Sequence, residues 1–171
     1  MIKLEDTYKY CTACKGPLTV QAECKECPDC GKQYFFNAQA TSAVIVTNAK
    51  GEILLITRGR EPYKGWLGLP GGFVKPNETL EEAADRELQE ETGITGLQLT
   101  YVSSFFEDYD YRGEDIPVVT ALFTGVIKDH TVIKPADDAA DFAFMAPADI
   151  PLDRIAFKHF QKFLETYIQA K

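Results

Sequence analysis

Hydrophobic residues in the larger, second part of the chain gather in short runs of the length of β-strands. Two apolar runs, residues 42–47 (SAVIVT) and 52–57 (EILLIT), flank the turn-forming residues 48–51 (NAKG), which predicts a β-hairpin. Other apolar runs bounded by turn residues predict further strands over residues 66–69, 97–106, 118–127 and 142–145. We therefore expect a sheet at the centre of this part of the chain.

Two segments have helical spacing instead. The first is predicted over residues 79–92, because Thr79 can cap its start, Glu82 can complete a capping box and Gly93 can end it. The second lies near the C-terminus, where an apolar stripe is formed by Ile155, Phe157, Phe160, Phe163, Leu164, Tyr167 and Ile168. Mixed strands with few helices favour an α/β fold in which a sheet is packed between helical layers.

All five cysteines lie near the N-terminus. Cys11 and Cys14 form one CxxC pair, and Cys27 and Cys30 form a second one twelve residues later. Four thiolates from two such pairs suit one tetrahedral ion, so this spacing predicts a zinc site, with iron or metal-free thiols as the alternatives. Cys24 forms a competing CxxC pair with Cys27, and we interpret it as a spare thiol because the Pro-Asp-Cys-Gly sequence ending the second pair is typical of a ribbon knuckle.

The chain therefore divides into a zinc ribbon, residues 1–38, and a larger domain, residues 39–171. The ribbon carries five lysines and five acidic residues, so it has no basic surface, and a structural role is favoured over contact with nucleic acid. The net charge of −8 likewise predicts no nucleic-acid or membrane partner. The N-terminal sequence lacks the apolar segment of a signal peptide and no apolar run approaches about 20 residues, which predicts a cytoplasmic protein.

The helix predicted over residues 79–92 is unusually acidic. Residues 78–93 contain seven carboxylates and a single basic residue, Arg86. Like charges at helical spacing each cost a few tenths of a kcal/mol, so a solvated acidic face is a weak explanation. At 100° per residue, Glu87, Glu90 and Glu91 share one narrow face of the helix. Carboxylate oxygens are the ligands that Mg²⁺ prefers, which predicts a divalent-cation site on this face.

The same segment matches a known motif in full. The pattern is G-x5-E-x7-R-E-U-x-E-E-x-G-U, where U is a bulky aliphatic residue, and the chain thereby resembles Nudix hydrolases. The matching residues are Gly72, Glu78, Arg86, Glu87, Leu88, Glu90, Glu91, Gly93 and Ile94. With the Leu-Pro-Gly-Gly lead-in, the strand order and the C-terminal helix, the resemblance extends over about residues 40–165. It implies the Nudix fold, an α/β/α sandwich with a mixed sheet, in which the motif forms a loop–helix–loop.

The resemblance also implies a metal-dependent active site. It makes Mg²⁺ or Mn²⁺ the expected cofactor, and the implied ligands are Glu87, Glu90, Glu91 and the carbonyl of Gly71. Glu78 and Arg86 are similar to the pair that braces the loop in the family.

The expected reaction is hydrolysis of the diphosphate bond in a nucleoside diphosphate linked to another group. It requires a general base within hydrogen-bond reach of the attacking water. Glu87 is one candidate. Asp138 is another, because some relatives take the base from the corresponding later loop, where the family often has Glu. Arg86 completes the catalytic candidates.

The substrate stays open between ADP-ribose, NADH, sugar nucleotides and dinucleoside polyphosphates. A ribbon before the domain resembles NADH pyrophosphatases, but their Ser-Gln-Pro-Trp-Pro-Phe-Pro-type motif is absent from residues 101–111. ADP-ribose hydrolases tend to have a proline where this chain has Tyr109 and Asp110. Tyr111 matches a tyrosine that dinucleoside polyphosphate hydrolases tend to have.

Other interpretations are also compatible with the sequence. Phe105 and Phe106 could stack on a nucleobase or pack at the end of a strand. The domain could be a non-catalytic sensor of nucleotide metabolites, although the intact motif favours an enzyme. A homodimer is a further expectation from the sequence.

Overall fold

A computed structural model describes residues 2–111, 113–128, 133 and 139–169, with the backbone alone for residues 2–5 and 111. The chain forms two compact units, one comprising Met1–Gln39 with Asp108–Val118 and the other Ala40–Glu107 with Val119–Lys171. The ribbon boundary at residue 38 stays a prediction.

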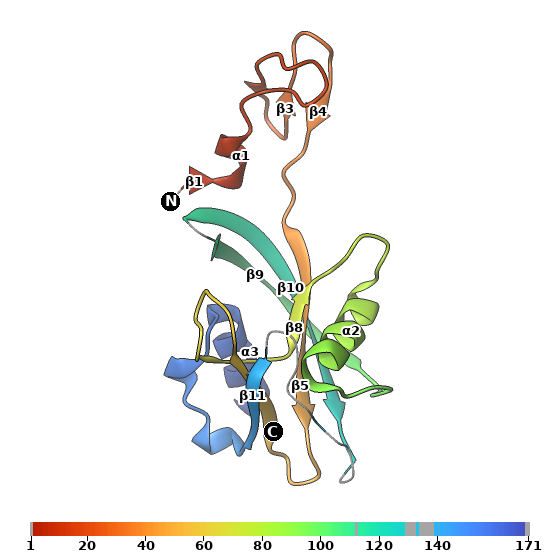
Figure 1. Cartoon of the computed structure of the whole chain (residues 1–171), viewed down its shortest axis with the longest axis vertical. Helices are drawn as coiled ribbons and strands as arrows, with labels where there is room; N and C mark the ends of the chain where they lie inside the picture. Colours follow the sequence, from red (N-terminus) through yellow and green to blue (C-terminus); the bar gives the residue numbers. More distant parts are fainter. Residues whose placement is uncertain (1, 112, 129–132, 134–138, 170–171) are drawn as a thin grey trace. The chain divides into compact units, whose positions relative to one another are not determined.

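The first unit is built from very short elements (Figure 1). Strand β1 (Ile2–Lys3) pairs in parallel with Glu114 and Asp115, and helix α1 (Leu4–Thr7) follows it. A three-stranded antiparallel sheet follows in the order β2 (Thr19–Val20), β3 (Lys25–Glu26), β4 (Gln33–Tyr34).

Within residues 6–39, Cys11 and Cys27 are the buried side chains. Two cysteines are too little apolar surface to stabilise a fold, which favours a bound metal ion as the stabilising element of the ribbon.

The second unit contains a mixed sheet flanked by two helices (Figure 1). The strands of this sheet are β5 (Gln39–Thr47), β6 (Ile53–Arg58), β7 (Leu67–Gly68), β8 (Gly71–Phe73), β9 (Thr100–Tyr111), β10 (Glu114–Val126) and β11 (Ala139–Met145), of which residues 39 and 108–118 are counted with the first unit. The path through the sheet is β1-β10-β5-β6-β11, with β7 on β6, β8 on β5 and β9 on β10. The helices are α2 (Leu80–Thr92) and α3 (Lys158–Gln169), and two short 3₁₀ turns, Pro147–Asp149 and Leu152–Arg154, precede α3.

Continuous burial along β5 and β6 shows that both faces of this sheet are covered. Val44, Val46 and Leu54 belong to the core cluster that includes Ala84 and Leu88 of α2. The alternate residues of the same strands point to the opposite face and are also fully buried: Ile45, Ile53 and Leu55. On that other side, Phe163 and Leu164 of α3 are buried. The result is the predicted sheet between helical layers.

Most predicted elements are confirmed, with shifted ends. The hairpin of β5 and β6, the short β7 and the strand β11 lie where the sequence predicts them. The predicted strands over residues 97–106 and 118–127 correspond to β9 and β10, but their bounds are shifted along the chain to 100–111 and 114–126. This difference arises because they form one long hairpin, and its pairing extends beyond the apolar residues.

The start of the C-terminal helix was predicted wrongly. Ile155 and Phe157 belong to the apolar stripe, but α3 begins only at Lys158. Ile155 forms a parallel bridge with Leu67, and the Ala156 N–H donates to the Leu67 carbonyl at 2.8 Å. Pairing with β7 therefore holds this segment in an extended conformation.

No helix in the described part of the chain is both long and apolar enough to cross a membrane.

Candidate active site

A cleft of about 470 Å³ opens beside the acidic face of α2. Its walls come from β6, from β8 and the loop that follows β8, and from α2. The charged side chains that line it are Arg58, Lys75, Arg86, Glu87, Glu90 and Glu91. The predicted acidic residues of the motif therefore share one cavity with three cations.

The ends of α2 fix which residues face this cleft. The Glu82 N–H donates to Thr79 Oγ1 at 3.1 Å and the Thr79 N–H donates to Glu82 Oε2 at 2.8 Å, so the predicted capping box is confirmed. Gly93 ends the helix with φ 74°, and its N–H donates to the Gln89 carbonyl at 2.9 Å. Leu88 is fully buried on the core side.

Helical spacing would allow Leu80 to face the core together with Leu88, but the structure does not place it there. Its side chain is 38% exposed, whereas Ala83 and Ala84 are fully buried. As the first residue of α2, Leu80 lies at the end of the helix, and the two alanines provide the close contact with the sheet.

Arg86 is the centre of the site. Its Nε and Nη2 donate to the two oxygens of Glu78, at 2.6 and 3.0 Å, and Nη2 also donates to the Phe73 carbonyl at 3.0 Å. Its Nη1 donates to Glu87 Oε1 at 2.6 Å and to Glu90 Oε2 at 2.9 Å. A planar fork of this kind ties the loop after β8 to the helix and orients two of the acidic side chains at once.

The environment shifts the pKa values of these carboxyl groups in opposite directions. The hydrogen bonds from Arg86, followed by that from the Lys75 backbone, lower the pKa of Glu78 to about 2. Burial raises the pKa of Glu87 above its usual range, despite the neighbouring Arg86. Burial would also raise the pKa of Glu90, but hydrogen bonds from Lys75 and Arg86 outweigh it and lower the pKa. Glu87 is thus more easily protonated than Glu78 and Glu90.

The glycines before the helix permit the close approach that this site requires. A Cβ on Gly72 would lie 2.5 Å from Glu87 Oε1, and one on Gly71 would lie 2.3 Å from the Ser42 carbonyl of β5. The Gly71 N–H donates to Glu91 Oε2 at 3.0 Å. Any larger residue at these two positions would displace either the carboxylate of Glu87 or strand β5.

The donor set of the cleft fits a hard divalent cation. It offers carboxylate oxygens, and Glu87 and Glu90 converge on one cationic group, the Nη1 of Arg86. The third predicted ligand, Glu91, is 6% exposed and turned towards Gly71. Among the described residues, the sulfur atoms of the four clustered cysteines all lie within 4.8 Å of one another, as the ligands of one metal ion would. The oxygens of the three glutamates do not form such a group among the described residues. The ligand assignment of Gly71, Glu87, Glu90 and Glu91 therefore stays a prediction.

The four predicted cysteines of the ribbon lie together. The Sγ–Sγ distances are 3.6 Å for Cys11 and Cys30, 3.3 Å for Cys14 and Cys27, and 3.5 Å for Cys14 and Cys30. Four sulfurs around zinc at about 2.3 Å would be about 3.8 Å apart, so the spacing fits a tetrahedral ion. Cys24 lies outside this group.

The two knuckles of the ribbon have the same backbone geometry. In the first, the Cys11 N–H donates to the Gly16 carbonyl and the Lys15 N–H donates back to the Cys11 carbonyl. In the second, the Cys27 N–H donates to the Lys32 carbonyl and the Gly31 N–H donates back to the Cys27 carbonyl. The hydroxyl of Tyr34 lies 3.2 Å from Cys11 Sγ, and this hydrogen bond is the largest cause of a Cys11 pKa lowered to about 6. A thiolate is the form that binds metal.

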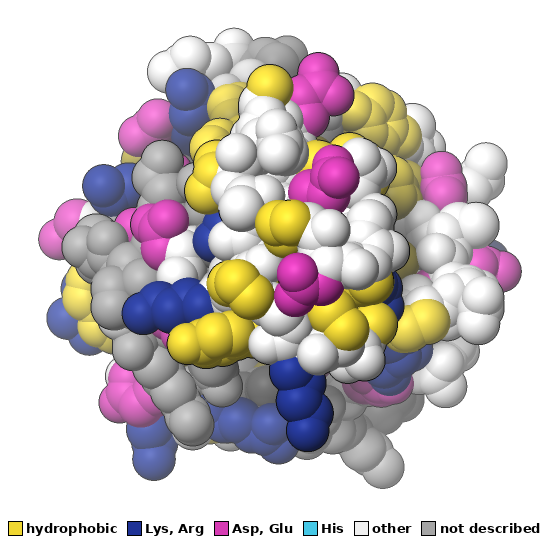
Figure 2. Space-filling model, turned by 90° about the horizontal axis from the view of Figure 1, so that it is seen from above, with side chains coloured by type: hydrophobic (Ala, Val, Ile, Leu, Met, Phe, Trp, Pro, Cys, Tyr) yellow, Lys and Arg dark blue, Asp and Glu magenta, His cyan; other side chains and the backbone are white. Residues whose placement is uncertain are grey.

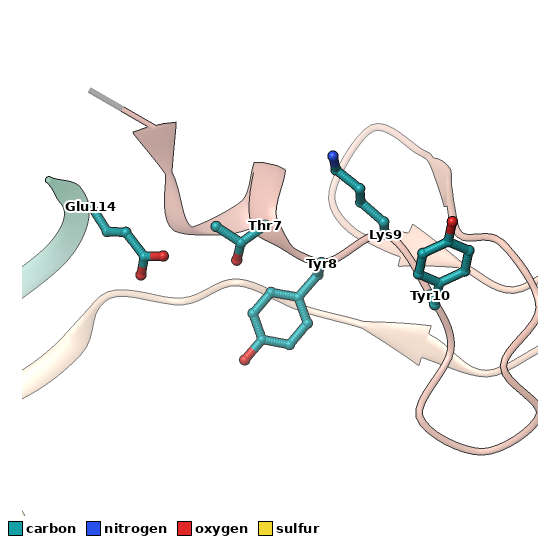
Figure 3. Close-up of a pocket in the computed structure, with 5 residues that line it drawn as sticks. All are labelled: Thr7, Tyr8, Lys9, Tyr10 and Glu114. Carbon is teal, nitrogen blue, oxygen red and sulfur yellow. The ribbon is translucent and has the colours of Figure 1, made fainter.

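A second pocket, of about 450 Å³, lies in the first unit (Figure 3). It is lined by Thr7, Tyr8, Lys9, Tyr10 and Glu114. Figure 3 shows the side chains of Tyr8 and Lys9 on opposite sides of the chain, so they do not converge on a ligand. On the face drawn in Figure 2, hydrophobic side chains lie among both basic and acidic ones, so that face carries no continuous surface of one charge.

The sequence analysis missed an interaction between α3 and β9. His159 Nδ1 is hydrogen-bonded to Glu107 Oε2, which also accepts the His159 backbone N–H at 3.2 Å. The pKa of Glu107 is lowered because the bonds to His159 outweigh the effect of burial. The two residues are 52 positions apart, so no local spacing could have revealed the pair.

The remaining candidates divide between the described and undescribed parts of the chain. Phe105 packs edge-on against Phe163 with ring centroids 4.8 Å apart, whereas Phe106 is 60% exposed. Asp138 and the side chain of Tyr111 lie outside the described residues, so their predicted roles stay predictions.

A family model described as the NUDIX domain matches residues 37–166 of the chain. The ADP-ribose pyrophosphatase of Methanocaldococcus jannaschii is 37% identical over 139 residues, which are 81% of this chain and 77% of that protein. The NAD-capped RNA hydrolase NudC of Chromobacterium violaceum is 35% identical over 100 residues, which are 57% of this chain. The match spans only 37% of that protein's length.

Solved structures resemble the fold. A NUDIX hydrolase from Nitrosomonas europaea aligns with a TM-score of 0.73 at 23% identity, covering 96% of this chain and 92% of its own. The NUDIX domain of Shewanella oneidensis NrtR, complexed with ADP ribose, aligns with a TM-score of 0.64 at 22% identity, covering 84% and 93%. At such low identity these likenesses establish the fold alone, and they confirm the predicted α/β arrangement.

Proposed function

The chain belongs to the NUDIX family of pyrophosphohydrolases, and from that premise we propose that it hydrolyses the diphosphate of ADP-ribose or a closely related nucleoside diphosphate derivative. The observation that carries the proposal is the convergence of Glu87 and Glu90 on Arg86 inside a cleft that also contains Glu91. The complete motif and this geometry favour an enzyme over the alternative of a non-catalytic sensor.

We assign the metal site of this reaction to α2. Glu87, Glu90 and Glu91, with the Gly71 carbonyl, would hold Mg²⁺ or Mn²⁺. When bound, the cation would polarise the attacking water and screen the charge of the diphosphate. Arg86 is anchored by Glu78 and positions Glu87 and Glu90 through its own hydrogen bonds, so it acts through the ligands.

Other side chains of the cleft would bind the substrate or move the proton. Arg58 and Lys75 bring two cations to a cavity that must accept a diphosphate. Arg58 is held in place because its Nε donates to the Pro62 carbonyl at 2.9 Å and its guanidinium lies 4.7 Å from the centre of the Phe157 ring. Glu87 is a candidate general base, since burial raises its pKa towards the range in which a carboxylate accepts a proton more readily. Asp138 remains the other candidate.

ADP-ribose is the substrate we favour, because the match with the ADP-ribose pyrophosphatase of M. jannaschii covers 77% of that protein. The absence of a proline at residues 109 and 110 does not fit the tendency of that subfamily. NADH is less favoured, because residues 101–111 lack the motif of NADH pyrophosphatases.

We also propose that zinc binds the four cysteines as a structural ion and that residues 1–38 form a separate ribbon. A homodimer is proposed from the sequence alone and can be tested by size-exclusion chromatography.

A substrate panel tests the proposed function. The full chain is incubated with Mg²⁺ and equal concentrations of ADP-ribose, NADH, a sugar nucleotide or a dinucleoside polyphosphate, and the released mononucleotide is quantified by chromatography. We expect the highest kcat/KM for ADP-ribose, with AMP and ribose 5-phosphate as products, and no turnover with EDTA. Higher kcat/KM for another member of the panel would replace ADP-ribose. No turnover on any member would favour the sensor.

A further inference from the structure

Lys75 places a cation of the protein where a metal ion is expected. Its Nζ lies 3.2 Å from Glu90 Oε1, and both residues line the cleft. The other oxygen of Glu90, Oε2, accepts a hydrogen bond from Arg86 Nη1 at 2.9 Å. Both oxygens of this candidate ligand are therefore engaged by side chains of the chain itself.

The two cations on Glu90 are held with very different strength. Arg86 has an 18% exposed side chain and four further hydrogen bonds, to Glu78, Glu87 and the Phe73 carbonyl. The side chain of Lys75 is 57% exposed, and Glu90 is its ion-pair partner. An exposed ion pair on a flexible four-carbon stem contributes little and is easily broken. A divalent cation that approaches Glu90 would therefore displace Lys75 and leave Arg86 in place.

The backbone of Lys75 keeps this ammonium group at the site. Its N–H donates to Glu78 Oε2 at 2.8 Å, and Glu78 is in turn fixed by Arg86. The residue thus begins from an anchored point of the loop, and only its side chain is free to move. A lysine without this backbone hydrogen bond would not be kept beside the Glu90 carboxylate.

We propose that Lys75 is an internal counter-ion of Glu90 that the divalent cation must displace, so that Lys75 sets the metal affinity of the cleft. This inference rests on the proposed function, because it takes Glu90 as a metal ligand. In the metal-free protein, Lys75 neutralises part of the acidic face. In the metal-bound protein, the same charge would repel the cation and so weaken its affinity.

Removal of the lysine charge should therefore tighten metal binding. Mn²⁺ is titrated into the full chain without substrate, and free Mn²⁺ is followed by electron paramagnetic resonance at low salt. We expect Lys75→Met to bind Mn²⁺ about three- to tenfold more tightly than the unaltered chain. Lys64→Met is the matched control, because Lys64 is an exposed lysine outside the cleft lining, and we expect its affinity within about twofold of the unaltered chain.

A double substitution shows whether the effect passes through Glu90. In a Glu90→Gln background, Lys75→Met should raise the Mn²⁺ affinity by a smaller factor, since the ion pair with Glu90 is gone and only the repulsion between lysine and cation remains. Three results would each overturn the inference and leave the proposed metal site standing. Lys75→Met could bind Mn²⁺ no more tightly than the unaltered chain, Lys64→Met could show the same gain in affinity, or the gain could be undiminished in the Glu90→Gln background. An unaltered chain that binds no Mn²⁺ would overturn the proposed metal site and the inference together.

Discussion

Arg86 and Glu78 form a two-point fork, in which Nε donates to Oε1 at 2.6 Å and Nη2 donates to Oε2 at 3.0 Å. Glu78 lies in the loop before α2 and Arg86 lies at the middle of the helix. The fork therefore closes the loop onto the helix, and the remaining donors of the same guanidinium orient Glu87 and Glu90. One side chain thus couples the stability of the loop to the geometry of the acidic face.

Replacing Arg86 by lysine should disturb both properties. A lysine keeps the charge but has no planar fork, so it cannot reach Glu78, Glu87 and Glu90 simultaneously. We expect a lower free energy of unfolding, because several of the hydrogen bonds that Arg86 donates to these carboxylates are lost. Urea denaturation measures this decrease. Turnover should fall by about 10- to 100-fold in the folded fraction, and an Arg86→Lys variant with unchanged activity would contradict the positioning role.

The Glu78–Arg86 pair should make part of the stability depend on pH in the acid range. The folded-state pKa of Glu78 is lowered to about 2 from an ordinary value of 4.5. A lowered pKa contributes stability that is fully present above pH 4.5 and is lost as the pH falls through 4.5 to 2. Unfolding free energies of the unaltered chain and of Glu78→Gln should accordingly differ by a constant amount above pH 4.5 and converge below it. A gap that stays constant down to pH 2 would show that the carboxylate charge contributes nothing.

Substituting Glu91 by glutamine should remove metal-dependent turnover and leave the fold intact. Glutamine keeps an oxygen that can accept the hydrogen bond of the Gly71 N–H, so we expect the melting temperature to change by no more than a few degrees. Loss of a charged ligand should lower kcat/KM by at least about 100-fold. Asp85→Asn is the matched control, because Asp85 is exposed on α2 and outside the cleft lining. Retained turnover in Glu91→Gln would exclude Glu91 as a required ligand.

Zinc content should distinguish the four clustered cysteines from Cys24. Elemental analysis of the purified chain should give about one zinc ion per molecule. Cys24→Ser should keep this content, since Cys24 lies outside the cluster, whereas Cys27→Ser should lose most of it. The two variants differ in one atom each from the same parent, so their comparison controls for general effects of cysteine removal. Equal zinc content in both would mean that Cys24 can replace Cys27.

Local patterns in the sequence determined the elements that depend on neighbouring residues. Two continuous apolar runs around a turn determined β5 and β6. Residues 79–82 determined the start of α2, because a capping box is formed within one helical turn. The motif placed Glu87, Glu90 and Glu91 on one face of the helix, since rotation per residue is a property of the helix itself.

Only the tertiary structure decided which partners these side chains take. From helical spacing, Arg86 could pair with either Glu82 or Glu90. In the fold Glu82 is occupied by the capping box, and Arg86 bonds instead to Glu90 and to Glu78 in the preceding loop. Glu91 turns to Gly71, twenty residues away, and Lys75 takes Glu90. The spacing of residues along a helix gives the direction of a side chain, whereas its partners depend on which loop or strand the packing brings opposite to it.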